Sequence, residues 1–358
     1  MTHFLRDILR QPAELRRTFA YLSGPGRHAL DEAGEMVRSA RHVYLTGIGS
    51  SWHAALAAGA LSHSDGIPVH LLDAAELVHG GSFPKDSALV VISRSGRSAE
   101  IIGLLSKARR CGAKVVGITN VADGCLAQES HIPIVVPVAL DHAISVNTYS
   151  TLAAAAGTLA STAADSFDMP IFPSMADAFA DAERALADWQ DEIEDSSWFS
   201  PGAAYYFLGR GSSLGTCHEA RLLWEEGVKS PATAMGTGAF RHGPQEIVAQ
   251  GMRFAMWIDG RRMREEDLAV AHDLRQLGAS VMLIGQRLPE NVADLTLQLP
   301  EISPAWQFLT EIIPAQLAAE RLARLSGVDC DSFRICSYVV EDEYGLLREE
   351  ISAPKDEK

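Results

Sequence analysis

Short apolar runs alternate with longer stretches of helical periodicity along the first half of the chain. The short runs are rich in β-branched residues and predict strands at residues 43–46, 69–72, 88–92, 114–118 and 132–136. Residues 88–92 are apolar without interruption, as expected for a strand that is covered on both faces. Helices are expected between the strands, at residues 52–62 and 98–110. This alternation predicts a parallel, doubly wound α/β sheet.

The same pattern starts again in the second half. An apolar helix is expected at residues 148–163, and a polar, acidic helix that would act as a connector at 174–195. Further strands are expected at residues 205–208, 254–258 and 281–284. We therefore predict a helical lead-in, a first α/β domain, a connecting helix, a second α/β domain and a tail, at residues 1–26, 27–170, 171–196, 197–340 and 341–358.

A glycine-serine turn occurs twice. Residues 47–51 (Gly-Ile-Gly-Ser-Ser) return as residues 209–213 (Gly-Arg-Gly-Ser-Ser), about 160 residues later. Each copy lies between a predicted strand and a predicted helix, which favours a duplicated domain. A dinucleotide-binding turn would need a third glycine where Trp52 stands, so we disfavour that interpretation.

A serine-rich loop follows the apolar strand at residues 88–92. Ser93, Ser95 and Ser98 lie at the predicted start of a helix, where free backbone amides and the positive end of the helix dipole favour an anion. Arg94 or Arg97 would add a charge-assisted contact. A single serine would suffice to cap the helix. Three serines therefore favour a phosphate site over a plain cap.

Composition and charge argue against several classes of protein. The net charge of −15 argues against general nucleic-acid binding, which requires a basic surface. No apolar stretch of about 18 residues or more is present, and the first residues lack the apolar centre of a signal peptide, so no membrane span or leader is expected. The five cysteines are odd in number and lack the spacing of a zinc site. We expect reduced thiols in a cytoplasmic protein without a metal or an organic cofactor.

The chain resembles the sugar isomerase (SIS) domain family over nearly its whole length. The resemblance rests on the two motifs Gly49-Ser50-Ser51 and Ser93-x-Ser95-Gly96-x-Ser98. It is closest to the isomerase half of glutamine–fructose-6-phosphate aminotransferase and to related amino-sugar isomerases, deaminases and deglycases. It implies two tandem SIS domains of flavodoxin-like fold. It also implies a sugar-phosphate ligand whose phosphate is held by Ser51, Ser93, Ser95 and Ser98, with Gly49, Ser50 and Arg94 in the same site and Ser145 as a further candidate.

The resemblance also implies the acid–base groups. In that family, a glutamate with the spacing of Glu226 moves a proton between sugar C1 and C2. The histidine of a His-Gly-Pro turn, here His242, sixteen residues later, opens the sugar ring from a neighbouring subunit. At least a homodimer is therefore expected, and the apolar segment 308–325 offers a surface for assembly. Taken alone, Glu226 would fit a solvated helix face as well as Glu225 does; Glu219 is a weaker candidate that would orient the site.

Two departures from the family pattern limit the activity. In the aminotransferase, a lysine near the C-terminus forms a Schiff base with the ketose, and a second lysine of the site lies on the helix of the catalytic glutamate. These two positions are Tyr338 and Leu223 in this sequence, and tyrosine cannot form a Schiff base. We expect no glutaminase domain before the first predicted SIS domain. The second domain is expected to lack a serine loop, because residues 284–289 stand at the corresponding step. Isomerisation, deamination or deglycation of a sugar 6-phosphate remain open, as does a sensor that binds a sugar phosphate without turnover.

Overall fold

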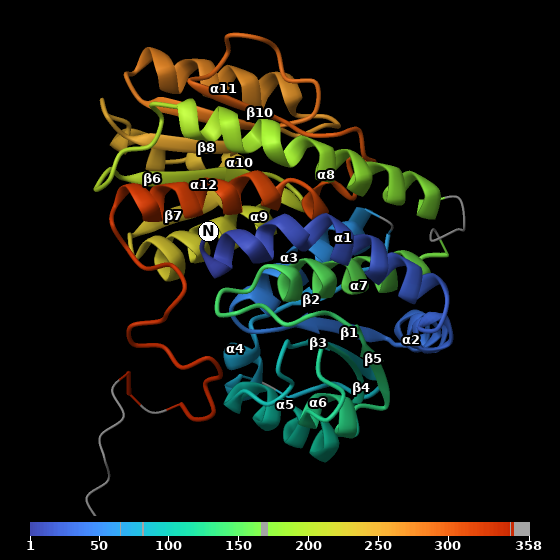
Figure 1. The fold of residues 1–358 in the computed structure, drawn as a ribbon. Coiled ribbons are helices and arrows are strands. Elements are labelled where there is room, and N and C mark those ends of the chain that lie inside the picture. Colours follow the sequence, from blue (N-terminus) through green and yellow to red (C-terminus); the bar gives the residue numbers. More distant parts are fainter. Residues whose placement is uncertain (65, 81, 166–170, 344, 347–358) are drawn as a thin grey trace, which may run out of the picture.

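The chain folds into two α/β lobes around two five-stranded parallel sheets (Figure 1). The computed structural model describes residues 1–343, 345 and 346, with the exception of residues 65, 81 and 166–170. Most of the expected tail at 341–358 therefore lies outside the described residues. The second sheet has the strand order of the first, which confirms the predicted fold class of two doubly wound, flavodoxin-like domains.

The first sheet has the order β2-β1-β3-β4-β5. Its strands are β1 (His42–Thr46), β2 (His70–Leu71), β3 (Ser87–Ile92), β4 (Lys114–Thr119) and β5 (Ile132–Val135). The second sheet runs β7-β6-β8-β9-β10 when written in the same sense. Its strands are β6 (Tyr205–Gly209), β7 (Ala232–Gly236), β8 (Arg253–Trp257), β9 (Ser280–Gly285) and β10 (Leu295–Gln298). The sequence analysis missed β7 and β10, which are the two edge strands of the second sheet.

The helices cover both faces of each sheet and fill the space between the lobes. They are α1 (His3–Ser23), α2 (Arg27–Ser39), α3 (Ser50–Ser64), α4 (Ala74–His79), α5 (Ala99–Cys111), α6 (Cys125–Glu129), α7 (Asn147–Ala163), α8 (Ile171–Asp195), α9 (Ser213–Leu223), α10 (Thr237–Phe240), α11 (Arg264–Gln276) and α12 (Ile312–Leu325). Figure 1 shows α1, α3, α7, α9 and α12 between the two sheets. One apolar cluster includes buried residues of both lobes, so the lobes share a core.

Helix α12 is an interior element. Ile312, Ile313 and Leu317 are buried, and the helix packs against α1, α8 and α9. The expectation that segment 308–325 offers an assembly surface is therefore wrong, because its apolar side chains already contact this chain's own helices. No helix within the described residues has the length and apolar character needed to cross a bilayer. All five cysteines are free.

A buried carboxylate organises the start of the central helix α7. Asp141 is only 4% exposed and accepts hydrogen bonds from the backbone N–H groups of Val146 (3.0 Å), Asn147 (3.1 Å) and Thr148 (2.9 Å). The Thr148 hydroxyl (2.8 Å), the Asn147 amide (2.8 Å) and Arg10 (3.1 Å) donate to the same carboxylate. Every residue of α7 is buried, so these N–H groups have no access to bulk water.

Replacing this carboxylate should destabilise the whole protein. In Asp141→Asn an NH2 group faces backbone donors, so we expect the free energy of unfolding to fall by about 2–4 kcal/mol. Urea unfolding followed by circular dichroism measures the change. The exposed Asp123→Asn serves as control and should stay within about 0.5 kcal/mol of wild type. An Asp141→Asn protein as stable as this control would contradict the assigned role.

Candidate active site

A cavity of about 220 Å³ opens at the carboxyl ends of β1 and β3 in the first lobe. This is where doubly wound sheets bind their ligands. Its wall contains nine of the residues that the sequence analysis selected: Gly49, Ser50, Ser51, Ser93, Arg94, Ser95, Ser98, Ser145 and Glu226. Groups from both lobes therefore meet in one cavity. Glu100 and the segment around Tyr338 complete the wall and were not predicted as parts of it.

The serine loop is shaped by its own backbone. The Ser93 hydroxyl accepts a hydrogen bond from the N–H of Gly96 (3.1 Å), and Gly96 adopts a φ of 65° that favours glycine. Ser98 occupies the N-cap position of α5 but makes no capping hydrogen bond. Its hydroxyl is buried and has no hydrogen-bond partner among the described residues. This hydroxyl therefore does not serve as a plain cap and is available to a ligand.

Arg94 joins the serine loop to the C-terminal segment. Its guanidinium donates to the hydroxyl of Ser145 (3.1 Å) and to the backbone carbonyl of Tyr338 (2.7 Å). It also lies over the Tyr338 ring, 3.9 Å from the ring centroid. The N–H of Ala99 donates to the carbonyl of Val340 (3.0 Å). Tyr338, which stands where the family resemblance places a lysine, thus packs against the arginine of the serine loop.

Glu226 projects from a π-helical turn. The turn spans Trp224–Val228 and directly continues α9. π-helical turns are rare in proteins, and many of them lie at functional sites. Burial, and to a smaller extent the charge of an ionised Glu219, raise the pKa of Glu226 to about 7, although Arg94 and Lys229 oppose the shift. A carboxyl group with this pKa can both accept and release a proton near neutrality.

Glu219 lies behind the cavity wall. It is 1% exposed and connects the lobes, because it accepts hydrogen bonds from Ser50 (2.8 Å) and contacts Nδ1 of His53 (2.7 Å), both on α3. Burial raises the pKa of Glu219 to about 8 and lowers the pKa of His53 to about 3. Both pKa shifts agree with a protonated Glu219 that donates a hydrogen bond to a neutral His53. The sequence analysis did not select His53. Its role depends on a contact with Glu219, which lies 166 residues later in the chain on a different helix.

Comparison with known proteins agrees with this geometry. Residues 36–161 match the family model described as "SIS domain".

The first lobe is therefore similar to SIS domains over these residues.

Curated relatives extend the similarity to both lobes. Glutamine–fructose-6-phosphate aminotransferase of Bacillus spizizenii is 26% identical over 346 residues, which cover 93% of this chain and 57% of the relative. The enzyme of Pyrobaculum aerophilum is 26% identical over 341 residues, with 93% and 56% covered. The chain thus spans little more than half the length of these relatives.

Solved structures share the two-lobed fold. The C-terminal domain of the aminotransferase from Francisella tularensis superposes with a TM-score of 0.82 at 21% identity, covering 92% of this chain and 98% of that chain. Glucosamine-6-phosphate deaminase from Thermotoga maritima gives 0.78 at 21% identity, with 95% and 99% covered. Tagatose-6-phosphate ketose/aldose isomerase from Escherichia coli gives 0.80 at 21% identity, with 93% and 96% covered.

His242 lies outside the serine-loop cavity of its own chain. It occupies an exposed turn after α10 in the second lobe and is absent from the cavity wall. Leu223, the other position where the resemblance places a lysine, is buried. The structure therefore brings Glu226 to the serine loop, but it does not bring His242 there within one chain.

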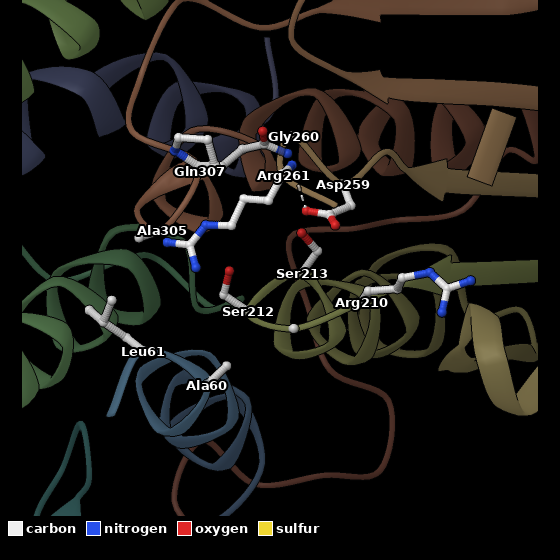
Figure 2. A pocket seen from close by; sticks show the side chains of 12 residues that line it. Ala60, Leu61, Arg210, Ser212, Ser213, Asp259, Gly260, Arg261, Ala305 and Gln307 are labelled. Atoms are coloured by element: carbon white, nitrogen blue, oxygen red, sulfur yellow. Dashed lines mark hydrogen bonds between the residues drawn. The ribbon is translucent and has the colours of Figure 1, made fainter. Parts of the chain in front are cut away.

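The second lobe carries a different loop at the place equivalent to the serine loop. The sequence analysis located this place at residues 284–289, after β9, which is wrong. In the second sheet, β8 has the position that β3 has in the first sheet. The equivalent loop is therefore the one that follows β8 and contains Asp259. It borders a cavity of about 100 Å³ beside the second Gly-Ser-Ser turn (Figure 2).

The carboxylate of Asp259 occupies the place in this second loop that a bound anion would take. Its carboxylate accepts hydrogen bonds from the N–H groups of Arg261 (3.0 Å), Arg262 (3.1 Å) and Met263 (3.0 Å). Partial burial alone would raise the pKa of Asp259, but these three donors hold it below its ordinary value. The amides that would meet a phosphate are thus occupied by the chain itself. Figure 2 shows the carboxylate turned toward the backbone of Arg261.

Ser98→Ala separates ligand binding from stability. The Ser98 hydroxyl is buried and has no partner in the described part of the chain, so its removal should leave the free energy of unfolding of the ligand-free protein within about 0.5 kcal/mol of wild type. Loss of one hydrogen bond to a charged phosphate should weaken binding of glucose 6-phosphate by about 10- to 100-fold. Calorimetric titration measures the binding, with the exposed Ser39→Ala as control. Unchanged affinity in Ser98→Ala would place the phosphate elsewhere.

Proposed function

We propose that the protein is an enzyme that moves a proton between C1 and C2 of a sugar or amino-sugar 6-phosphate. Such a step leads to isomerisation, deamination or deglycation. The observation that carries the proposal is the position of Glu226, whose pKa is raised to about 7, in the same cavity as the serine loop. The five free cysteines support a place in the reducing cytoplasm.

The serine loop binds the phosphate in this proposal. The Ser98 hydroxyl and the hydroxyl of Ser51, which also lines the cavity, donate to its oxygens, and Arg94 contributes positive charge. This contact fixes one end of a six-carbon chain. The carbons at the other end then extend toward Glu226, the group from the second lobe.

Glu226 acts as the base in its deprotonated form. It takes the proton from the carbon next to the carbonyl and returns it to the former carbonyl carbon. The hydroxyl proton of the first carbon passes to the former carbonyl oxygen, so the carbonyl moves between C1 and C2 and the sugar is neither oxidised nor reduced overall. The partly buried position strengthens its basicity by removing water from the carboxylate. The tyrosine at position 338 offers no amine for a Schiff base, which argues against the aminotransferase reaction.

A homodimer would complete the site. His242 is exposed and lies outside its own chain's cavity, whereas the family resemblance gives its equivalent a ring-opening role in a neighbouring subunit. We therefore place His242 of one chain beside Glu226 of a second copy. An imidazole suits this step, because it exchanges protons near neutral pH.

Glu226→Gln should keep binding and lose turnover. Glutamine preserves shape but cannot accept the proton, so we expect turnover to fall by about 10²–10⁴-fold while glucose 6-phosphate binds as before. In wild type, the rate should rise with pH and reach half its plateau near pH 7, because Glu226 must be deprotonated. Deuterium incorporation at C1 or C2, followed by NMR, measures the step.

The neighbouring Glu225→Gln is the matched control for this experiment. Glu225 is exposed, so its variant should exchange deuterium at the wild-type rate. If Glu226→Gln also exchanges at that rate, Glu226 is not the base and Glu219 becomes the next candidate. If wild type binds phosphosugars and exchanges nothing on any of them, the protein is a sugar-phosphate sensor.

Mixed dimers test the role of His242. His242→Ala should slow cyclic substrates more than open-chain analogues. After subunit exchange between His242→Ala and Glu226→Gln proteins, hybrid dimers should regain one complete site, giving about a quarter of wild-type activity for a random mixture. The two parents, incubated without exchange and assayed on the same cyclic substrate, are the control. No recovery in verified hybrids would place His242 in the site of its own chain or outside any site.

A further inference from the structure

Glu226 stands at the junction of two cavities. The serine-loop cavity of about 220 Å³ lies on one side, and a second cavity of about 370 Å³ lies on the other. The two cavities share three wall residues, Glu226, Phe333 and Cys336. The proposed base therefore faces both spaces at once.

The second cavity has apolar walls and a cationic rim. Pro231, Phe333 and Ile335 supply apolar surface, and Lys229 and Arg334 supply positive charge. The carboxylate of Glu225, which also borders the cavity, faces Arg221 at 3.9 Å. This composition suits a group with an apolar stem and an anionic end.

The two cations differ in availability. Lys229 is fixed, since its ammonium donates to the backbone carbonyls of Glu226 and Ser332 and its backbone adopts a φ of 57°. Arg334 is exposed, and within the described part of the chain no carboxylate forms an ion pair with it. A guanidinium can bind a carboxylate through two parallel hydrogen bonds. Arg334 is thus the group at the rim that is free to bind an anion.

The position of Glu226 indicates which part of a substrate would occupy the second cavity. With the phosphate at the serine loop, the reacting carbons C1 and C2 lie beside Glu226, where a plain hexose phosphate ends. The second cavity begins at this point. It therefore receives whatever is attached to the reacting end of the sugar.

We propose that this second cavity is a subsite for an amino acid joined through its nitrogen to the reacting end of a 6-phosphosugar. Its apolar walls contact the side chain, and Arg334 binds the carboxylate. This inference rests on the proposed function and narrows its substrate class to sugar phosphates with an amino-acid substituent. Proton transfer by Glu226 would then occur next to the bond that joins sugar and amino acid.

Three probes test the subsite by calorimetric titration. They are 1-deoxyfructose 6-phosphate joined at C1 to the nitrogen of norleucine, the same compound with the norleucine carboxylate as a neutral amide, and glucose 6-phosphate. Wild type should bind the carboxylate compound about 10-fold or more tightly than the amide, as expected for hydrogen bonds to a charged group. Arg334→Met should lose this preference and bind glucose 6-phosphate as wild type does. Arg110→Met, an exposed substitution outside both cavities, should keep the preference.

The outcomes separate this inference from the proposed function. If wild type binds glucose 6-phosphate but does not distinguish acid from amide, the subsite is wrong and the phosphosugar proposal stands. If it binds none of the three probes, the phosphosugar proposal itself fails. If Arg334→Met keeps the preference but changes the oligomeric state in light scattering, the second cavity is an interface between copies of the chain and the subsite is overturned.

Discussion

The contact between Glu219 and helix α3 fixes the geometry on which the site depends. The serine loop belongs to the first lobe and Glu226 to the second, so the distance between them is set by how the lobes pack. Ser50 and His53 hold Glu219 in the α3–α9 interface, and Ser50 is next to Ser51 in the cavity wall. Glu219 lies two helical turns before Glu226 on a continuous helical segment. An uncharged hydrogen-bonded group suits this position, because an unpaired charge there would cost several kcal/mol. Ionisation of Glu219 would raise the pKa of Glu226, so this residue links the packing of the lobes to the electrostatics of Glu226.

Local patterns predicted the first lobe well and the second lobe less well. The strand at 88–92 and the serine loop after it were predicted because apolar runs and helix-start residues act over a few positions. Strand β7 was missed because Ala-Thr-Ala-Met-Gly is half-buried and has few β-branched residues. His53 was missed because a lone histidine in an alanine-rich helix carries no sign of a partner in another lobe. The second loop was misplaced because its equivalence depends on the order of strands in the sheet, which a linear pattern does not contain.

The two lobes show two solutions to one physical problem. A strand that leads into a helix leaves several backbone N–H groups without acceptors at the turn. In the first lobe the serine loop leaves the Ser98 hydroxyl without a partner among the residues that the structure describes. In the second lobe the Asp259 carboxylate satisfies three N–H groups. Two sheets with the same strand order can therefore carry loops that differ in whether the chain itself satisfies their donors.

The crossing of the C-terminal segment onto the first lobe has a consequence for biosynthesis. Val340 accepts a hydrogen bond from Ala99, 241 residues earlier in the chain, and Tyr338 packs against Arg94. A chain emerging from the ribosome can fold its first sheet long before these residues are made. The cavity at its serine loop then lacks one wall until residues 333–340 have been made. Formation of the complete cavity therefore waits for the synthesis of this segment, and a nascent chain stalled after α12 would present a folded first lobe with an unfinished pocket.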